Sequence, residues 1–458
     1  MKNKIKNIHF IGIGGSGMSG IAEVMHNLKF NVQGSDLGKS ETIRHLKRIG
    51  IKIFSKHLEK NIKNMDVLVI SAAISDQNPE VKAANKQKIP IIPRAEMLSE
   101  LMRFKKGIAV AGTHGKTTTT SLIASILTEG KLDPTYVIGG RLNSMNASAK
   151  LGDSDLMIVE ADESDASFLH LNPVSAVITN IDNDHLGTYQ NNFESLKQTY
   201  IDFAHQVPFY GSIFLCADDK HAKSIMAKIS RPIVTYGLKN KVDIQAVNIK
   251  HEGNKAHFMV VDNKYNQNKF NITINFPGEH FVRNTLAAIA IALEYGVSKN
   301  SIQKALINFE GVARRYEIYN NVLIQNKKIK VIDDYGHHPT EIEAVLKATK
   351  KGFRNKKINL VFQPHRFSRT IDCYEEFMRV LKIPDKIFIF DIYSAGEVNK
   401  TNISTKTLMK SLKHPSMYYL PNFKTAKNTI ANLIEDGSIL IIMGAGSIGQ
   451  FTEKIIEK

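Results

Sequence analysis

The chain has 458 residues, of which 43% are hydrophobic and 23% charged, and its formal net charge is +17. This length exceeds one ordinary hydrophobic core, so we expect two or three soluble globular domains. No apolar run approaches the ~18–20 residues of a membrane-spanning helix, and the basic N-terminus passes straight into a strand without signal-peptide features. Cys216 and Cys373 are isolated, which excludes a disulfide framework. We expect a cytoplasmic protein without a membrane partner.

The excess of basic residues raises the question of a nucleic-acid partner. Lysines are scattered through every segment, with local clusters such as KKGFRNKK (351–358), and no basic stripe is interleaved with aromatic residues. We therefore expect no nucleic-acid partner, with an NTPase stimulated by nucleic acid as the alternative. The positive field would still attract substrates that carry phosphate groups.

The order of apolar segments predicts three α/β domains, at 1–104, 105–312 and 313–458. In each domain, short apolar runs alternate with stretches of helical periodicity, which is typical of a parallel sheet with crossover helices. Residues 241–276 are instead rich in β-formers and turn residues, and we expect a meander there. The segments with strand character are 8–13, 30–36, 67–74, 89–94, 106–112, 155–162, 175–181, 212–216, 232–237, 328–336, 357–366, 386–396 and 438–446.

A glycine signature follows the first predicted strand. Residues 12–17 fit G-x-G-x-x-G at a strand–helix junction, and an acid lies about 20 residues further on, where this fingerprint places a ribose contact. Amides at a helix N-terminus favour an anion, so we expect a pyrophosphate here. The motif alone leaves open a nicotinamide dinucleotide, another diphosphate nucleotide and a turn without a ligand. A similar GAGSIG at 444–449 has too little chain after it for a βαβ unit, and we expect a tight turn. The predicted contacts are Gly12, Gly14, Gly15, Ser16, Gly17 and Asp36.

A second nucleotide motif, GTHGKT, opens the central domain at 112–117. It is a phosphate loop in which Val110 replaces the first glycine of the usual pattern. In such a loop the lysine, here Lys116, reaches the β- and γ-phosphates, and the following hydroxyl, here Thr117, ligates Mg²⁺. The predicted nucleotide contacts are Gly112, Thr113, His114, Gly115, Lys116, Thr117 and Thr118.

Candidate metal ligands follow two further strands of the central domain. Glu160 ends the run DLMIVE, in the place where an acid would hold the metal of a phosphate loop. His185 lies in the polar loop after SAVITNI, and a histidine near the carboxyl end of a strand in this sheet suits a metal or phosphate contact. We expect Mg²⁺ to be held by Thr117, Glu160 and His185.

Polar side chains also gather at the strand ends of the third domain, in VIDDYGHHPTEI (331–342) and FQPHRFSRT (362–370). Two arginines, Arg314 and Arg315, stand at the preceding domain junction. Guanidinium groups bind carboxylates and phosphates through paired hydrogen bonds. The domain therefore suits a substrate that carries a carboxylate, and its arginines suit a γ-phosphate.

In this order the motifs resemble the Mur ligases of peptidoglycan synthesis, over essentially the whole chain. They are HFIGIGGSGMSGIAEV, GTHGKTTTT, EADESDASFLHL, NIDNDHL, GVARRYE, DDYGHHPTEI and QPHRFSRT. The resemblance implies an N-terminal Rossmann-like domain for the UDP-sugar, a central P-loop ATPase-like domain and a C-terminal Rossmann-like domain for the amino acid. It implies UDP-N-acetylmuramate, L-alanine and ATP as substrates with Mg²⁺ as cofactor. We expect a monomer or homodimer.

The resemblance also implies roles for single residues. Lys116 would contact the ATP phosphates, Thr117 and Glu160 would hold one Mg²⁺, and His185 a second. His280 and Asn284 would lie against the adenine, although Phe281 stands where the family has an asparagine. Either Arg314 or Arg315, together with Asp334, would serve the γ-phosphate and ribose. The L-alanine side of the cleft would comprise Tyr335, His337, Arg366 and Arg369.

The expected reaction is amide formation from a carboxylate and an amine after phosphoryl transfer from ATP. It needs no enzyme nucleophile, which agrees with the lack of a serine, cysteine or threonine triad in the sequence. Catalysis would come from positioning and charge neutralisation by Mg²⁺, Lys116, Arg314 and Arg315, with His337 or His185 as the amine base. One alternative is a recycling ligase that joins a murein tripeptide to the same UDP-sugar. A more remote one is an NAD(P)-dependent dehydrogenase.

Overall fold

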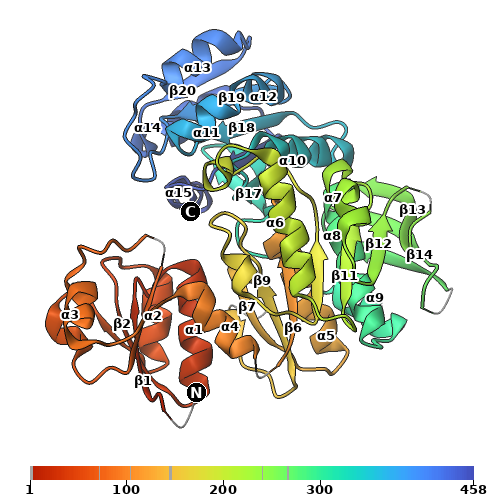
Figure 1. The fold of residues 1–458 in the computed structure, drawn as a ribbon. Coiled ribbons are helices and arrows are strands. Elements are labelled where there is room, and N and C mark those ends of the chain that lie inside the picture. The colour runs from red at the N-terminus through yellow and green to blue at the C-terminus, as the bar shows by residue number, and fades with distance from the viewer. Residues whose placement is uncertain are drawn as a thin grey trace. The chain divides into compact units, whose positions relative to one another are not determined.

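The computed structural model describes residues 4–71, 73–103, 105–143, 147–239, 241–265 and 268–457. It is a mixed α/β structure with three sheets (Figure 1). The chain forms two compact units. The first comprises Met1–Val247, Met259–Asn271 and Arg283–Phe309, and the second comprises Asn248–Phe258, Ile272–Val282 and Glu310–Lys458. Within the described residues, no helix combines the length and apolar character needed to cross a membrane.

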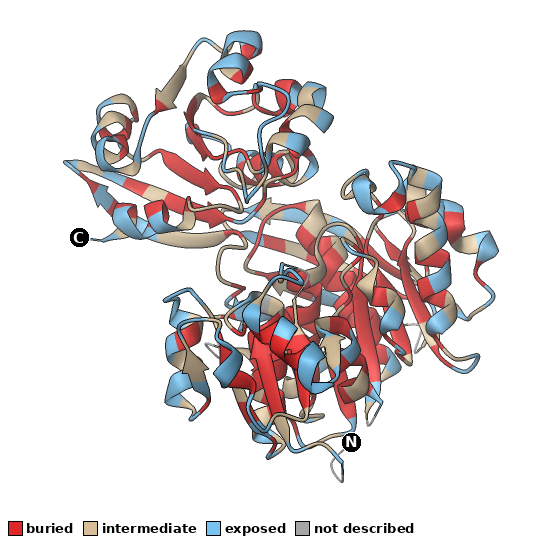
Figure 2. Cartoon of the chain, turned by 60° about the vertical axis from the view of Figure 1, so that its left-hand side comes forward, coloured by how far each residue is buried: buried red, intermediate tan, exposed pale blue. Residues whose placement is uncertain are grey.

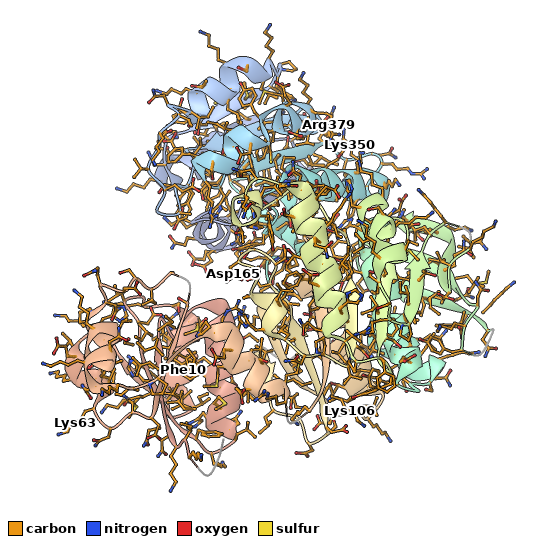
Figure 3. The ribbon with its side chains drawn as sticks, in the orientation of Figure 1. Phe10, Lys63, Lys106, Asp165, Lys350 and Arg379 are labelled. Carbon is orange, nitrogen blue, oxygen red and sulfur yellow. The ribbon has the colours of Figure 1, made fainter. Side chains whose placement is uncertain are left out.

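The N-terminal sheet has five parallel strands in the order β3-β2-β1-β4-β5. The strand order reverses between β1 and β4, and sheets of this kind bind ligands outside the carboxyl ends of the strands at such a point. Phe10 on β1 is fully buried in this layer (Figure 3). The elements are β1 (Asn7–Ile11), α1 (Ser16–Asn27), β2 (Asn31–Ser35), α2 (Glu41–Arg48), β3 (Lys52–Phe54), η1 (Glu59–Ile62), β4 (Val67–Ile70), α3 (Pro79–Gln87), β5 (Ile91–Pro93) and α4 (Arg94–Met102).

The second sheet has ten strands in the order β15-β14-β13-β12-β11-β10-β6-β9-β7-β8. Its strands β6, β9, β10, β11 and β12 pair in parallel, and β7 with β8 forms an antiparallel hairpin. The elements are β6 (Lys106–Ala111), α5 (Lys116–Glu129), β7 (Thr135–Leu142), β8 (Ala147–Lys150), β9 (Leu156–Glu160), η2 (Ser167–His170), β10 (Ser175–Ile178), η3 (Leu186–Tyr189), α6 (Phe193–Gln206), β11 (Ser212–Cys216), α7 (Lys220–Ile225), η4 (Met226–Lys228), β12 (Ile233–Gly237), β13 (Ile244–Glu252), β14 (Lys255–Asp262), β15 (Lys269–Ile274), α8 (Glu279–Glu294) and α9 (Lys299–Ile307).

The C-terminal sheet has six strands in the order β16-β17-β21-β18-β19-β20, all paired in parallel except the hairpin β16/β17. The elements are β16 (Glu317–Ile324), β17 (Lys327–Asp334), α10 (Pro339–Gly352), β18 (Ile358–Phe362), α11 (Phe367–Asp372), α12 (Tyr374–Val380), β19 (Lys386–Phe390), α13 (Thr405–Leu412), β20 (Met417–Leu420), α14 (Phe423–Leu433), β21 (Ile439–Met443) and α15 (Gly449–Ile456).

The central strands of these sheets are buried on both faces. Every residue of β10, β18 and β21 is buried, and burial concentrates on the strands while the outer faces of many helices are exposed (Figure 2). Strands that are covered by helices on both sides have sequences that are continuous apolar runs. This is why the runs at 175–181, 357–366 and 438–446 are visible in the sequence, and the predicted α/β class is confirmed.

Local hydrogen bonds fix where two helices near the candidate sites begin. The Asn78 side chain accepts from the amide of Glu80 at the start of α3, and Pro79 occupies the first helical position. At the start of α10, His338 and Glu341 form a reciprocal capping box. Capping satisfies amides that have no partner within the helix, so both helix starts are well defined.

Candidate active site

The loop between β6 and α5 is shaped by two glycines. Gly112 has φ of +132° and Gly115 has φ of +84°, in the left-handed region that favours glycine. A Cβ on Gly112 would overlap the Thr179 hydroxyl, and one on Gly115 would lie 2.7 Å from Asn284 Oδ1. The backbone of the predicted phosphate loop is thus closely approached by two side chains. Asn284, predicted as an adenine contact, lies directly beside this loop.

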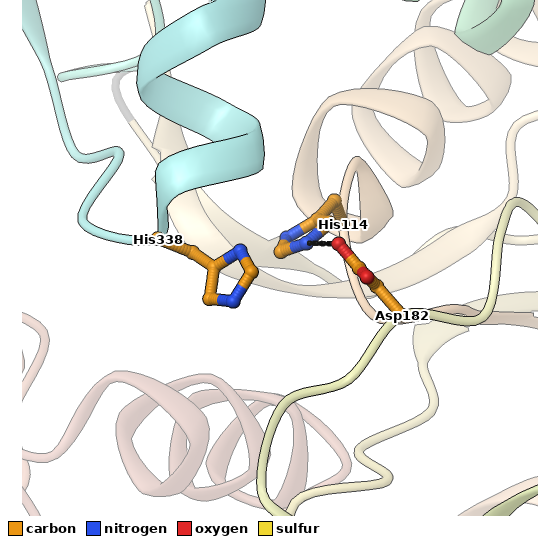
Figure 4. Close-up of side chains that lie close together, drawn as sticks. All are labelled: His114, Asp182 and His338. Carbon is orange, nitrogen blue, oxygen red and sulfur yellow. Dashed lines mark hydrogen bonds and ion pairs between the residues drawn. The ribbon is translucent and has the colours of Figure 1, made fainter. Parts of the chain in front are cut away.

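The loop that follows β10 holds the phosphate loop in place. The amide of His114 donates to Asn180 Oδ1 at 2.9 Å, and the Asn180 side chain donates back to the His114 carbonyl at 2.8 Å. Thr179 Oγ1 donates to the same carbonyl at 2.7 Å. The Asp182 amide donates to Thr113 Oγ1 at 2.9 Å. Figure 4 shows the contact of 3.1 Å between His114 Nε2 and Asp182 Oδ2. The sequence offered no signal for the supporting roles of Thr179 and Asn180.

Lys116 opens α5 and is paired with a buried acid. Its ammonium donates to the Gly112 carbonyl at 2.7 Å and to Glu163 Oε2 at 2.7 Å. The side chain of Glu163 is only 2% exposed. Burial opposes the charged form of Lys116, but Glu163 and other nearby carboxylates outweigh it and raise the lysine pKa. Burial also raises the pKa of Glu163 to about 7, against the attraction of the ammonium. The loop lysine is therefore charged and held over its own loop by a carboxylate that we did not assign from the sequence.

Two of the three predicted metal ligands lie together. Thr117 Oγ1 donates to Glu160 Oε2 at 3.3 Å, and the amide of Gly139 on β7 donates to Glu160 Oε1 at 2.7 Å. A hydroxyl and a carboxylate are hard oxygen ligands of the kind Mg²⁺ prefers, so these two residues fit the ion. His185, just before η3, has a left-handed backbone with φ of +58°, and its Nε2 lies 3.5 Å from Asp184 Oδ2. Its part in a second metal site stays a prediction.

The N-terminal glycine turn is held by the carboxyl end of β2. Gly12 has φ of +76°. Asp36 Oδ2 accepts from the Gly14 amide at 2.8 Å, and Asp36 Oδ1 accepts from the Gly38 amide at 2.7 Å. Asp36 thus shapes the turn with both oxygens, and its contact with a ribose hydroxyl stays a prediction. The side chain of Ser16 lies outside the described part of the structure.

An arginine that sequence reasoning missed lies over the same turn. A Cβ on Gly17 would lie 2.6 Å from Arg94 Nη1, so the arginine side chain packs directly against this glycine. Arg94 Nη2 donates to Asp162 Oδ2 at 3.3 Å. Asp162 adjoins Glu163, the partner of Lys116. Arg94 therefore links the glycine turn to the loop that carries these acids.

In the second unit, the two predicted arginines flank one tyrosine. The guanidinium carbons of Arg314 and Arg315 lie 5.3 and 5.0 Å from the centre of the Tyr335 ring. Arg314 pairs with Asp333 at 3.3 Å and donates to the Gly444 carbonyl at 2.6 Å. The segment 444–449 joins β21 to α15 and supports Arg314, in agreement with the prediction of a turn.

Asp333 and Asp334, at the end of β17, are buried carboxyl groups. Burial raises the pKa of each to about 6, although Arg314 opposes this for Asp333 and Arg315 for Asp334. Asp334 accepts from the amides of Tyr316 at 2.8 Å and Gly336 at 2.7 Å. The Gly336 amide is only two positions away, so Asp334 also shapes the turn that carries Tyr335.

The remaining predicted residues of this domain are His337, Arg366 and Arg369. His337 Nδ1 lies 3.1 Å from the Tyr335 carbonyl, and the His337 ring centre lies 5.5 Å from that of His365. Arg369 is buried, with Nη1 3.4 Å from His365 Nδ1, and Arg366 Nε lies 4.0 Å from Glu397. Burial lowers the pKa of His337 to about 3. A neutral imidazole with so low a pKa is a weak acceptor for an ammonium proton.

Phe281, which departs from the family pattern, is a core residue. It is 5% exposed, stacks on Phe276 with ring centres 5.0 Å apart, and meets Tyr316 edge-on at 5.7 Å. The neighbouring His280 ring lies 4.2 Å from it. Phe281 therefore contributes aromatic packing in the second unit.

The first unit thus carries a phosphate loop beside a strand-end acid, together with a Rossmann-type glycine turn, which defines a nucleotide-dependent α/β enzyme. The family description "Mur ligase family, catalytic domain" matches residues 7–106, "Mur ligase middle domain" matches 110–292, and "Mur ligase, glutamate ligase domain" matches 314–446. The chain belongs to the Mur ligase family.

Relatives match over the full length. A UDP-N-acetylmuramate–L-alanine ligase of Hydrogenovibrio crunogenus is 49% identical over 453 residues, which are 98% of each chain. One of Neisseria gonorrhoeae is 46% identical, covering 100% of this chain and 99% of the relative. The solved UDP-N-acetylmuramate–alanine ligase of Thermotoga maritima has a TM-score of 0.82 and 29% identity, covering 98% of both chains. A murein peptide ligase of Psychrobacter arcticus has a TM-score of 0.75 and 25% identity, with 98% of each chain covered.

Proposed function

We propose that this protein joins L-alanine to the lactyl carboxylate of UDP-N-acetylmuramate, with ATP as the co-substrate. The products are UDP-N-acetylmuramoyl-L-alanine, ADP and phosphate, and the reaction belongs to peptidoglycan precursor synthesis. The observation that carries this proposal is full-length identity of 49% to a ligase of this name. The likeness to the solved murein peptide ligase is lower, at 25% identity, so a recycling ligase is not favoured.

For this reaction we divide the chain into a UDP-sugar domain (1–104), an ATP domain (105–312) and an amino-acid domain (313–458). The pyrophosphate would lie at the glycine turn of residues 12–17, where α1 begins, and Asp36 fixes the shape of this turn by accepting from the Gly14 amide at 2.8 Å. In this assignment, the glycine signature binds the diphosphate of the UDP-sugar. The cytoplasm is the expected location, and a monomer or homodimer the expected assembly.

The second nucleotide loop would receive ATP. The charged Lys116 would contact the phosphates, and the backbone of residues 112–115 is already held by the loop after β10. Thr117 and Glu160, which are hydrogen-bonded to each other at 3.3 Å, would hold Mg²⁺. When bound there, the ion supplies positive charge that neutralises the phosphate oxygens.

The chemistry balances without an enzyme nucleophile. A carboxylate oxygen of the lactyl group attacks the γ-phosphorus of ATP, the bond to the β-phosphate oxygen breaks, and ADP leaves with that electron pair. The alanine amine then attacks the acyl carbon of the acyl phosphate, and phosphate leaves as the amide bond forms. The chain's part is to position the reactants and neutralise charge through Lys116, Arg314 and Arg315.

The third domain would orient the amino acid. Arg366 and Arg369 suit the α-carboxylate, because a guanidinium binds a carboxylate through two parallel hydrogen bonds. Tyr335 would line the same amino-acid site. The amine must lose a proton before it attacks, and His185 and His337 are the candidate bases. The pKa of about 3 makes His337 a weak proton acceptor.

The proposal can be tested by identifying the product. Purified protein is incubated with ATP, Mg²⁺, UDP-N-acetylmuramate and isotopically labelled L-alanine, and the nucleotide-sugar is analysed by mass spectrometry. We expect one labelled alanine per UDP-sugar, joined through an amide. If the label enters the UDP-sugar only when the murein tripeptide is supplied in place of free alanine, the recycling reaction is the correct one.

A further inference from the structure

A buried polar cluster in the N-terminal sheet region has no part in the reaction described so far. Its centre is the carboxylate of Glu80, the second residue of α3, which is fully buried. Partners from β1, β2, η1 and the segment after β3 surround it. Measured to the nearest Glu80 oxygen, they are His9 Nε2 at 3.4 Å, Ser35 Oγ at 2.5 Å, His57 Nδ1 at 3.3 Å and Asn61 Nδ2 at 2.6 Å.

These partners keep the buried group ionised. Burial opposes the charged form of Glu80, but the adjacent His9 ring and hydrogen bonds from Ser35 and Asn61 outweigh it and lower its pKa to about 2. Removing a charge from water is costly, and apolar residues of similar volume often stabilise a fold equally well. Stability alone therefore does not account for a carboxylate in this position, whereas a requirement for fixed geometry does.

The cluster is joined to the glycine turn through one residue. The hydroxyl of Ser35, the last residue of β2, donates to Glu80. The carbonyl of the same Ser35 accepts from the amides of Gly12 at 2.8 Å and Ile13 at 3.2 Å. The next residue is Asp36, whose carboxylate holds the Gly14 amide. At the end of β2, the Ser35 side chain thus contacts the cluster, whereas the Ser35 carbonyl and the Asp36 side chain contact the glycine turn.

We propose that Glu80 is a positioning residue for the UDP-sugar. It anchors Ser35 and thereby fixes the end of β2, whose carbonyl and following carboxylate hold the amides of Gly12, Ile13 and Gly14 and so set the backbone course of the glycine turn that receives the pyrophosphate. Glu80 itself does not touch the substrate. This inference rests on the proposed function, because it assigns the turn to the diphosphate of UDP-N-acetylmuramate. Binding groups that are held within about 0.5 Å of their working geometry lose little affinity to reorganisation.

The test uses Glu80→Gln, which keeps the shape and removes the charge, and Ser35→Ala, which removes the hydroxyl link and leaves the carboxylate. The dissociation constant for UDP-N-acetylmuramate is measured by calorimetry without ATP, well below the melting temperature of each variant. Steady-state KM values for the UDP-sugar and for ATP are measured separately. Loss of a hydrogen bond to a charged group predicts roughly tenfold weaker UDP-sugar binding, with KM for ATP within about twofold of wild type.

Glu23→Gln is the matched control. Glu23 also pairs with a histidine in this domain, at 3.2 Å to His45, and among the residues that the structure describes its side chain makes no hydrogen bond to the turn or to β2. We expect wild-type affinity for the UDP-sugar. An effect of Glu23→Gln as large as that of Glu80→Gln would mean that any lost acid–histidine pair weakens the domain, and would overturn the positioning role.

The outcomes separate this inference from the function on which it rests. If wild type does not bind UDP-N-acetylmuramate, the proposed function is wrong and the inference falls with it. If wild type binds and both variants bind equally well, only the inference is overturned. A similar rise in both KM values would also contradict it, because a positioning role confined to the UDP-sugar turn leaves the KM for ATP unchanged. Should Glu80→Gln fail to fold, Ser35→Ala decides the question.

Discussion

Lys116 illustrates what a motif indicates at the scale of one residue and what it leaves out. The GKT pattern identified the lysine and its expected contact with phosphate. The pattern did not indicate Glu163, which lies 47 positions away along the chain and pairs with the lysine at 2.7 Å. Nothing distinguishes this acid from its neighbours Asp162 and Asp165 in the sequence, because its partner is determined by how two strand ends meet in the sheet.

We predict that Lys116→Ala reduces phosphate release by about 10²–10³-fold, the usual cost of losing one charge-stabilising group. Binding of UDP-N-acetylmuramate should be nearly unchanged, because the glycine turn lies on a different sheet. A phosphate-release assay and calorimetry measure the two quantities.

The matched control is Lys106→Ala. Lys106 begins the same strand, β6, and its ion pair with Asp155 is exposed (Figure 3). Exposed ion pairs contribute little, so this variant should release phosphate at the wild-type rate. A Lys116→Ala protein that ligates at a near wild-type rate would contradict the role given to the phosphate loop.

At the scale of an element, the glycines of the phosphate loop couple backbone geometry to function. Gly112→Ala would place a methyl group against Thr179 at a backbone φ of +132°. We predict a large loss of phosphate release and a lower melting temperature, because the loop must shift away from Thr179. Gly187→Ala serves as control, since a Cβ there meets no heavy atom within 4 Å. Equal activity of the two variants would show that the loop tolerates the displacement.

The helix start that carries Glu80 predicts a pH dependence. The pKa of Glu80 is about 2 in the fold and 4.5 as its ordinary value. Relative to its protonated form, the ionised group therefore stabilises the fold above pH 4.5, and this difference, about 3 kcal/mol, is lost as pH falls from 4.5 toward 2. Urea unfolding followed by circular dichroism should show the difference between wild type and Glu80→Gln shrinking over this range.

The stability contribution of Glu23 should depend on pH in the opposite direction. Burial raises its pKa, so its contribution is present below pH 4.5 and lost as pH rises through the folded pKa. The difference between wild type and Glu23→Gln should therefore change in the other direction. A difference for Glu80→Gln that does not vary with pH would show that its carboxylate is not held ionised by the cluster.

Buried parallel strands were the elements most readily predicted. The runs that became β6, β9, β10, β18 and β21 are continuous and apolar, and the β-rich segment became β13, β14 and β15. The elements missed were short or edge strands, because partly exposed segments have no continuous apolar run. They include β3, β8, and β16 and β20 at the edges of the third sheet. The longer strand β7, which lies inside the second sheet and begins with four buried residues, was also missed.

At the scale of the whole molecule, the order of the motifs indicated the family, and the structure showed which contacts support each motif. Roles for Lys116, Thr117 and Glu160 could be proposed from the sequence because their types and spacing suit phosphate and metal binding, and these roles stay predictions. Residues that support the site through side-chain contacts, such as Arg94, Asn180 and Glu80, could not be predicted, because their partners come from distant parts of the chain. Asp36 was found by its spacing, yet in the structure it holds backbone amides.

The most direct test of the central claim is phosphate release from ATP with a panel of second substrates. The panel contains UDP-N-acetylmuramate with each of several L-amino acids, the same UDP-sugar with the murein tripeptide, and nucleic acid alone. We predict release that requires UDP-N-acetylmuramate and is greatest with L-alanine. Release that depends on nucleic acid, or that requires the tripeptide, would contradict the account.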